Sequence, residues 1–98
     1  MNPETKLKLK CLKYLKSLKK TLVWKLADKF SSGYPDLVVY RYPLLYGIEL
    51  KIGKNKATKL QEYVLNQIRE SGGIGVVCRS IEEVKQTINE KEASKDER

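Results

Sequence analysis

The sequence contains no histidine. This absence excludes Ser-His-Asp triads and papain-like Cys-His pairs, because both need an imidazole as the general base. It also excludes zinc sites with histidine ligands and every nuclease mechanism that uses a histidine base. Any catalysis by this chain must therefore depend on carboxylates and lysines.

Cysteines and long apolar segments are scarce as well. Cys11 and Cys78 lie far apart and form no C-x-x-C motif, which favours a reducing compartment over a disulfide framework. No apolar run reaches the roughly 18 residues of a membrane span, and there is no signal-peptide core. We expect a cytoplasmic protein without a membrane segment, whose 98 residues form one domain over 1–98 with a small core.

Positive charge is abundant and concentrated in the first third of the chain. The net charge is +8: residues 1–30 contribute 9 − 2 = +7, residues 31–81 contribute 7 − 4 = +3, and residues 82–98 contribute 4 − 6 = −2. A basic segment of this kind favours a polyanion, mainly through phosphate contacts that do not read base sequence. The alternative is a solvated lysine face on an ordinary helix.

Hydrophobic periodicity and turn residues predict an α/β fold with the element order α-β-β-β-α-β-α, in which helices flank a mixed sheet. Leucines three and four residues apart predict the basic N-terminal helix, and Pro43 marks the turn of an antiparallel hairpin. We expect the tail over 91–98 to be disordered. The expected elements are a helix over 4–20, strands over 21–27, 36–42 and 45–52, a helix over 58–71, a strand over 74–79 and a last helix from residue 81.

Polar residues interrupt the apolar strands of this hairpin at Asp36, Glu49 and Lys51. Side chains two apart on a strand point to the same face, so Glu49 and Lys51 project together, and the hairpin lets Asp36 approach Glu49. Two converging carboxylates are ligands for a divalent cation, and a neighbouring lysine can orient an attacking water. The alternative is an ion pair on a solvent-exposed face of the sheet.

The spacing P-D-x12-E-x-K of these residues resembles the signature of the PD-(D/E)XK nuclease superfamily, which has a restriction-endonuclease-like core. Further segments in the same order resemble its compact virus-type replication-repair (VRR-NUC) branch, which is similar to Holliday-junction resolvases. Over residues 22–84 these segments are Gly33-Tyr34-Pro35-Asp36-Leu37, Ile48-Glu49-Leu50-Lys51, Thr58-x-x-Gln61 and Ser71-Gly72-Gly73.

The resemblance implies a site for Mg²⁺, or Mn²⁺ in its place, formed by Asp36, Glu49 and the backbone carbonyl of Leu50. It implies that Lys51 positions the attacking water and that Gln61 supports it, although Gln61 also fits a capping box with Thr58.

Two further sets of residues have both a functional and an ordinary interpretation. Glu4 lies near the position of an auxiliary acid in many superfamily members, but it also suits the positive end of a helix dipole. Several basic side chains are candidate contacts for nucleic-acid phosphates or simply solvated. These candidates are Lys25, Lys29, Lys54, Lys56, Lys59 and Arg69.

The resulting hypothesis is a metal-dependent endonuclease that hydrolyses DNA, specific for branched or four-way junction structures, in replication, repair or recombination. We expect a homodimer, because a small chain leaves the apolar surface around Trp24, Tyr40 and Tyr42 uncovered; the resemblance also suggests a viral or phage origin. Two alternatives remain open: a nucleic-acid-binding module without catalysis, and a protein that binds partners or membrane surfaces through its basic amphipathic helix.

Overall fold

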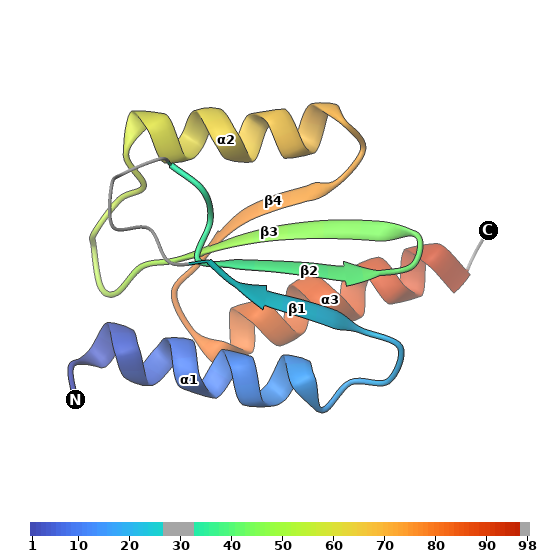
Figure 1. Ribbon diagram of the computed structural model, residues 1–98, viewed down its shortest axis with the longest axis horizontal. Helices are drawn as coiled ribbons and strands as arrows, with labels where there is room; N and C mark the ends of the chain where they lie inside the picture. Colours follow the sequence, from blue (N-terminus) through green and yellow to red (C-terminus); the bar gives the residue numbers. More distant parts are fainter. Residues whose placement is uncertain (27–32, 97–98) are drawn as a thin grey trace.

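The computed structural model describes residues 1–26 and 33–96, with side chains described as far as residue 90. Its element order, α-β-β-β-α-β-α, confirms the predicted fold class (Figure 1). The elements are α1 (Pro3–Lys16), β1 (Leu22–Lys25), β2 (Leu37–Arg41), β3 (Leu44–Leu50), α2 (Lys59–Glu70), β4 (Ile74–Cys78) and α3 (Ile81–Asp96).

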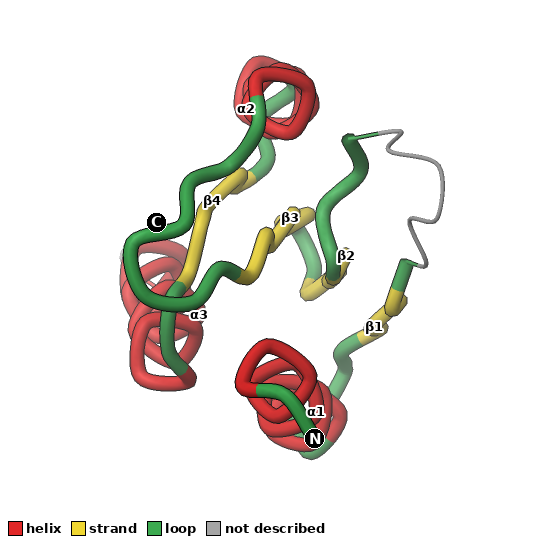
Figure 2. Tube along the Cα trace, turned by 90° about the vertical axis from the view of Figure 1, so that its left-hand side faces the viewer, coloured by secondary structure: helices red, strands yellow, loops and turns green. Residues whose placement is uncertain are grey.

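Within the described residues the strands form one mixed sheet in the order β1-β2-β3-β4 (Figure 2). The pairs β1–β2 and β2–β3 are antiparallel, and β3–β4 is parallel. The predicted hairpin is confirmed, with its turn at the cis Tyr42–Pro43 bond. A parallel pair needs a crossover connection, and α2 supplies it between β3 and β4.

Several element ends differ from the sequence-based expectation. α1 ends at Lys16 instead of residue 20, because Ser17 caps it and Lys20 has a left-handed φ of 54° as the chain turns toward β1. The strands are shorter than predicted, and β3 ends at Leu50. α3 extends from Ile81 to Asp96, past residue 91, where the sequence predicts the start of a disordered tail; residues 97–98 lie outside the described residues.

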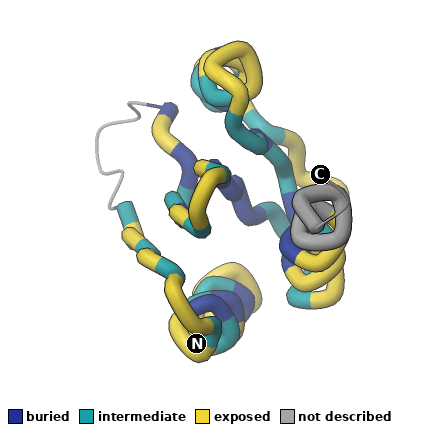
Figure 3. The backbone as a smooth tube through the Cα atoms, turned by 90° about the vertical axis from the view of Figure 1, so that its right-hand side faces the viewer, coloured by how far each residue is buried: buried dark blue, intermediate teal, exposed yellow. Residues whose placement is uncertain are grey.

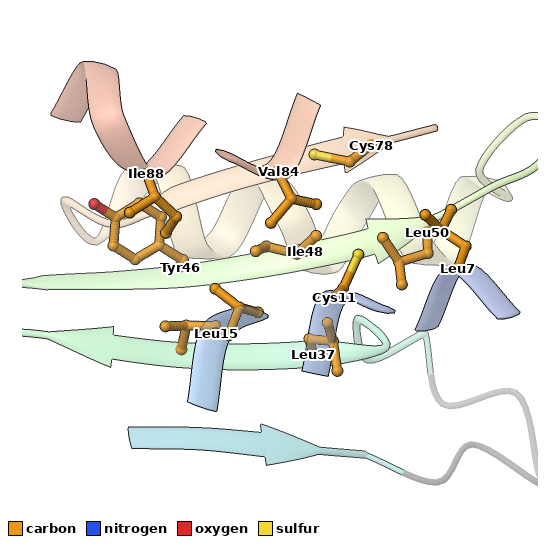
Figure 4. Packing of buried hydrophobic residues seen from close by; sticks show 11 residues of the cluster. Leu7, Cys11, Leu15, Leu37, Tyr46, Ile48, Leu50, Cys78, Val84 and Ile88 are labelled. Atoms are coloured by element: carbon orange, nitrogen blue, oxygen red, sulfur yellow. The ribbon is translucent and has the colours of Figure 1, made fainter. Parts of the chain in front are cut away.

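One face of the sheet, covered by α1 and α3, contains the hydrophobic core. Alternate residues of each strand point to this face, as the twofold periodicity of a strand requires, and they meet the buried stripes of the two helices (Figure 4). Figure 3 shows the same pattern: buried residues are concentrated in the central strands, and the outer surfaces of the helices are exposed. The core residues are Leu7, Cys11, Leu15, Leu37, Val39, Tyr46, Ile48, Leu50, Cys78, Val84 and Ile88.

α2 covers the opposite face, over β3 and β4. The paired residues Gly47 and Gly75 let this helix come close: a Cβ at Gly75 would lie 2.5 Å from the Leu65 carbonyl oxygen, and one at Gly47 would lie 2.4 Å from Cδ1 of Ile68. Apolar spacing in this helix predicts a buried stripe of Leu60, Val64 and Ile68. In the structure Ile68 does approach Gly47, but Leu65 is the buried residue and Leu60 is 44% exposed.

Candidate functional site

The register of the hairpin places the two candidate carboxylates opposite each other. Leu37 pairs with Ile48 across β2 and β3. Continuing this antiparallel register by one residue brings Asp36 opposite Glu49. The two acids therefore meet where β2 begins and β3 ends.

Asp36 is held in place by hydrogen bonding from the backbone of the neighbouring strand. Its Oδ2 accepts a hydrogen bond of 2.9 Å from the N–H of Leu50. Its Oδ1 lies 3.2 Å from the Nζ of Lys8, a residue of α1. Pro35 precedes it with a fixed φ, which stiffens the entry to β2. Both oxygens of Asp36 thus have a defined environment at the end of the hairpin.

Glu49 is a buried charged residue, with only 3% of its surface exposed. Burial above all, together with the negative charge of Asp36, raises its pKa from 4.5 to about 7, although Lys51 acts in the opposite direction. The Lys51 Nζ lies 3.5 Å from Oε2 of Glu49. The neighbouring carboxylates of Asp36 and Glu49 repel each other when both are ionised. A bound cation would stabilise the doubly ionised form.

Lys51 follows the last residue of β3 and is fixed by its backbone. Its N–H donates a 3.1 Å hydrogen bond to the carbonyl of Cys78, which extends the pairing of β3 with β4 by one step. Its side chain is mostly buried beside Glu49. The structure therefore brings Asp36, Glu49 and Lys51 together, as their spacing predicts.

The donor set suits a hard divalent cation. Carboxylate and carbonyl oxygens are the ligands that Mg²⁺ prefers, and it normally retains several waters. Asp36, Glu49 and the Leu50 carbonyl provide such oxygens on adjacent backbone positions of the hairpin. Within residues 1–26 and 33–90, no third acidic residue joins them to make a larger cluster. Glu4 in particular lies exposed in the first turn of α1, outside the carboxylate pair.

Gln61 forms the predicted capping box at the start of α2. Its Oε1 accepts a 2.8 Å hydrogen bond from the N–H of Thr58, and its own N–H donates to Oγ1 of Thr58 at 3.1 Å. This contact fixes the first turn of α2, the helix that packs over β3 and β4. Support of Lys51 by Gln61 stays a prediction.

The candidate phosphate contacts differ in their surroundings. Lys25, Lys54, Lys56 and Lys59 are exposed, and Lys29 lies outside the described residues. Arg69 is instead used within the fold, because its Nε donates a 2.8 Å hydrogen bond to the carbonyl of Gly75.

Sequence reasoning missed two basic residues near the site. Lys8, which contacts Asp36, belongs to the lysine-rich helix, but nothing local distinguishes it from its neighbours. Arg79 braces the loop that carries Lys54 and Lys56, since its Nη1 donates to the carbonyls of Gly53 and Asn55 at 2.8 and 2.6 Å. Both contacts join residues distant in sequence, so only the folded chain reveals them.

Comparisons with known proteins bear on the fold of the chain. No family model matches the sequence, and no curated protein is significantly similar to it. Among solved structures, one described as "VRR_NUC domain" superposes with a TM-score of 0.75 at 24% sequence identity, over 91% of this chain and 97% of that one. In the described part of the chain, no helix is both long and apolar enough to cross a membrane. The superposition on the solved structure shows that the chain has the fold of a VRR_NUC domain. This is the small mixed α/β core of restriction-endonuclease type that the sequence motifs predict.

Proposed function

We propose that this protein is a metal-dependent endonuclease of the PD-(D/E)XK kind that hydrolyses DNA phosphodiester bonds. The observation that supports this most is the meeting of Asp36, Glu49 and Lys51 at the end of the hairpin, within a VRR_NUC fold. A buried carboxylate such as that of Glu49, with a second carboxylate beside it, is expensive to maintain in an ordinary sheet. Its presence here is explained if the pair binds a cation.

In the proposed site, Asp36, Glu49 and the Leu50 carbonyl hold Mg²⁺ or Mn²⁺. The ion, when bound, polarises the scissile phosphate and lowers the pKa of an attacking water. The hydrogen bond from the Leu50 N–H keeps Asp36 oriented, which is the preorganisation such a site needs. Burial of Glu49 excludes bulk water and strengthens electrostatic contacts within the site.

Lys51 supplies the second element of the proposed chemistry. Its backbone is fixed by the hydrogen bond to Cys78 directly after β3, and its ammonium lies beside Glu49. From there it orients the water and stabilises negative charge that develops on the phosphoryl oxygens. Gln61, fixed at the start of α2, supports this arrangement from the covering helix.

The substrate we propose is branched or four-way junction DNA, cleaved by a symmetric dimer. Exposed lysines on the loop after β3 offer phosphate contacts that do not depend on base sequence. On the face covered by α2, β1 and β2 leave Trp24 49% exposed, next to Tyr40 and Leu22. A twofold axis through this surface would bury it twice and set two sites at a fixed separation.

A cleavage assay on labelled duplex, flap, single-stranded and four-way junction DNA tests the proposal. With Mg²⁺ or Mn²⁺ the wild-type protein should cut at least one of these, and the branched forms fastest. A chelator or the Glu49→Gln substitution should stop the reaction. Binding of DNA without any cleavage, under both metals, would instead support a non-catalytic binding module.

A further inference from the structure

Lys8 contacts the oxygen of Asp36 that the Leu50 N–H does not bind. The Leu50 N–H occupies Oδ2, whereas Oδ1 faces the Lys8 ammonium at 3.2 Å. Both side chains are largely shielded, with 23% of Lys8 and 17% of Asp36 exposed. The contact is therefore not one of the freely solvated ion pairs that contribute little.

The backbone of Lys8 is fixed, while its side chain can move. The residue adjoins Leu7, which is buried in the core with Cys11 and Leu15 of the same helix. α1 thus holds the Lys8 Cα at a set distance from the hairpin. A lysine side chain has a flexible four-carbon stem, so its ammonium can leave Asp36 without any shift of the helix.

A cation and the Lys8 ammonium would compete for the same carboxylate. Charges at a few ångströms repel strongly in a partly buried site. The pairs Lys8–Asp36 and Lys51–Glu49 balance two negative charges with two positive ones. Addition of a divalent cation gives the site a net charge of +2. This positive charge favours the binding of an anionic substrate such as a phosphodiester.

We propose that Lys8 is a second active-site lysine, which neutralises Asp36 in the metal-free chain and contacts a substrate phosphate once the cation has displaced it. This inference rests on the proposed function, because it assumes that Asp36 is a metal ligand. It assigns to α1 a direct part in the site, beyond its packing against the sheet. A purely structural ion pair would stabilise the fold and leave the affinity for metal unchanged.

The test compares Lys8→Met with Lys13→Met on the full chain. Methionine keeps the apolar stem and removes the charge. Lys13 is the matched control, because it lies on the same helix but lines the groove between α1 and α3 with Tyr14 and Lys85. Titration calorimetry with Mn²⁺ alone, without DNA, should show about tenfold tighter binding for Lys8→Met, since a competing cation is gone. Lys13→Met should bind Mn²⁺ within about twofold of wild type.

Cleavage of the best DNA substrate at saturating Mn²⁺ supplies the second readout. Lys8→Met should be slower by about tenfold or more, because a phosphate contact is lost, while Lys13→Met should retain most of its activity. Tighter Mn²⁺ binding combined with slower cleavage is a pair of results that a structural role does not produce. Unchanged or weaker Mn²⁺ binding by Lys8→Met, or undiminished cleavage, overturns the proposal.

Lys8→Arg keeps the proposal testable if Lys8→Met fails to fold. A guanidinium binds a carboxylate through two hydrogen bonds and is harder to displace. This variant should therefore bind Mn²⁺ more weakly than wild type, and equal or tighter binding would contradict the idea. If the wild-type protein binds no Mn²⁺, the proposed function is overturned as well. If the wild-type protein binds Mn²⁺ and cleaves DNA, and the Lys8 variants do both equally well, only the proposed role of Lys8 is overturned.

Discussion

The two faces of the sheet serve different purposes. The face toward α1 and α3 buries an unbroken set of apolar side chains from three strands and two helices. The face toward α2 contains Glu49 and the glycine pair Gly47 and Gly75, and α2 contributes Leu65 as its buried residue. Adjacent residues of one strand, Ile48 and Glu49, therefore belong to a hydrophobic core and to a polar site respectively.

Because the two sets of residues lie on opposite faces, substitutions in the polar site can leave the hydrophobic core unchanged. A strand can present charge on one side at no cost to the packing on the other, because successive side chains point in opposite directions. The cost to stability falls on the α2 side, where the buried carboxylate of Glu49 replaces an apolar side chain. Substitutions on the two faces should consequently fail in different assays.

The largest effect we expect is loss of catalysis from substitutions on the polar side. Asp36→Asn, Glu49→Gln and Lys51→Ala should each reduce the cleavage rate by about 10³-fold or more, since each removes a charge that acts on the reacting phosphate. Circular dichroism should show a folded protein in every case, because the core is untouched. A variant that cuts DNA at the wild-type rate would show that its residue has no part in the site.

A pair of leucine substitutions compares a core position of α1 with a partly exposed position of α2. Leu15→Ala, on the buried side of α1, should lower the free energy of unfolding by about 2–5 kcal/mol. Leu60→Ala, on the exposed side of α2, should lower it by less than about 1 kcal/mol. Urea unfolding monitored by circular dichroism measures both. Equal losses would mean that Leu60 is as important to the packing as Leu15.

Local patterns in the sequence predict most of the fold. Alternation in 36–42 and 45–52, with Pro43 between them, specifies the hairpin and its register, and the register alone brings Asp36 to Glu49. The capping box at Thr58 and Gln61 marks the start of α2 correctly. Each of these signals lies within a few residues, where turn and capping chemistry determine the structure.

What the sequence did not predict depends on contacts between distant segments. The rotation of α2 that buries Leu65 follows from the close approach of its backbone to Gly75, which belongs to a later strand. The contact of Lys8 with Asp36 needs α1 to be packed across the sheet before the two side chains can meet. Periodicity within one segment contains no information about either.

The pKa of Glu49 predicts how the stability of the metal-free protein changes with pH. Its value is raised from 4.5 to about 7 in the folded chain, so between these pH values the folded state retains a proton that the unfolded state has released. Stability should therefore fall as pH rises through this window and then stay constant above it. The penalty is on the order of 3 kcal/mol.

Glu49→Gln isolates this contribution. In the presence of a chelator, the variant should be more stable than wild type by a margin that is absent near pH 4.5 and grows until about pH 7. Excess Mg²⁺ should remove the advantage, because the cation stabilises the ionised wild-type pair. Urea unfolding across this pH range measures the margin, and a margin independent of pH would contradict the assignment to Glu49.

The smallest expected change in the stability of the fold concerns the uncovered part of the sheet on the α2 side. Trp24→Lys should alter the unfolding free energy of the isolated chain by about 0.5 kcal/mol, because the side chain is half exposed on β1. It should nevertheless convert the proposed dimer to a monomer, since a charge on a self-complementary surface meets its own copy across the twofold axis. Tyr63→Lys, on the exposed side of α2, is the control and should remain dimeric. Light scattering at micromolar concentration, with and without junction DNA, distinguishes these outcomes. A wild-type particle with the mass of one chain under both conditions would mean that the aromatic surface of β1 and β2 is not a dimer interface.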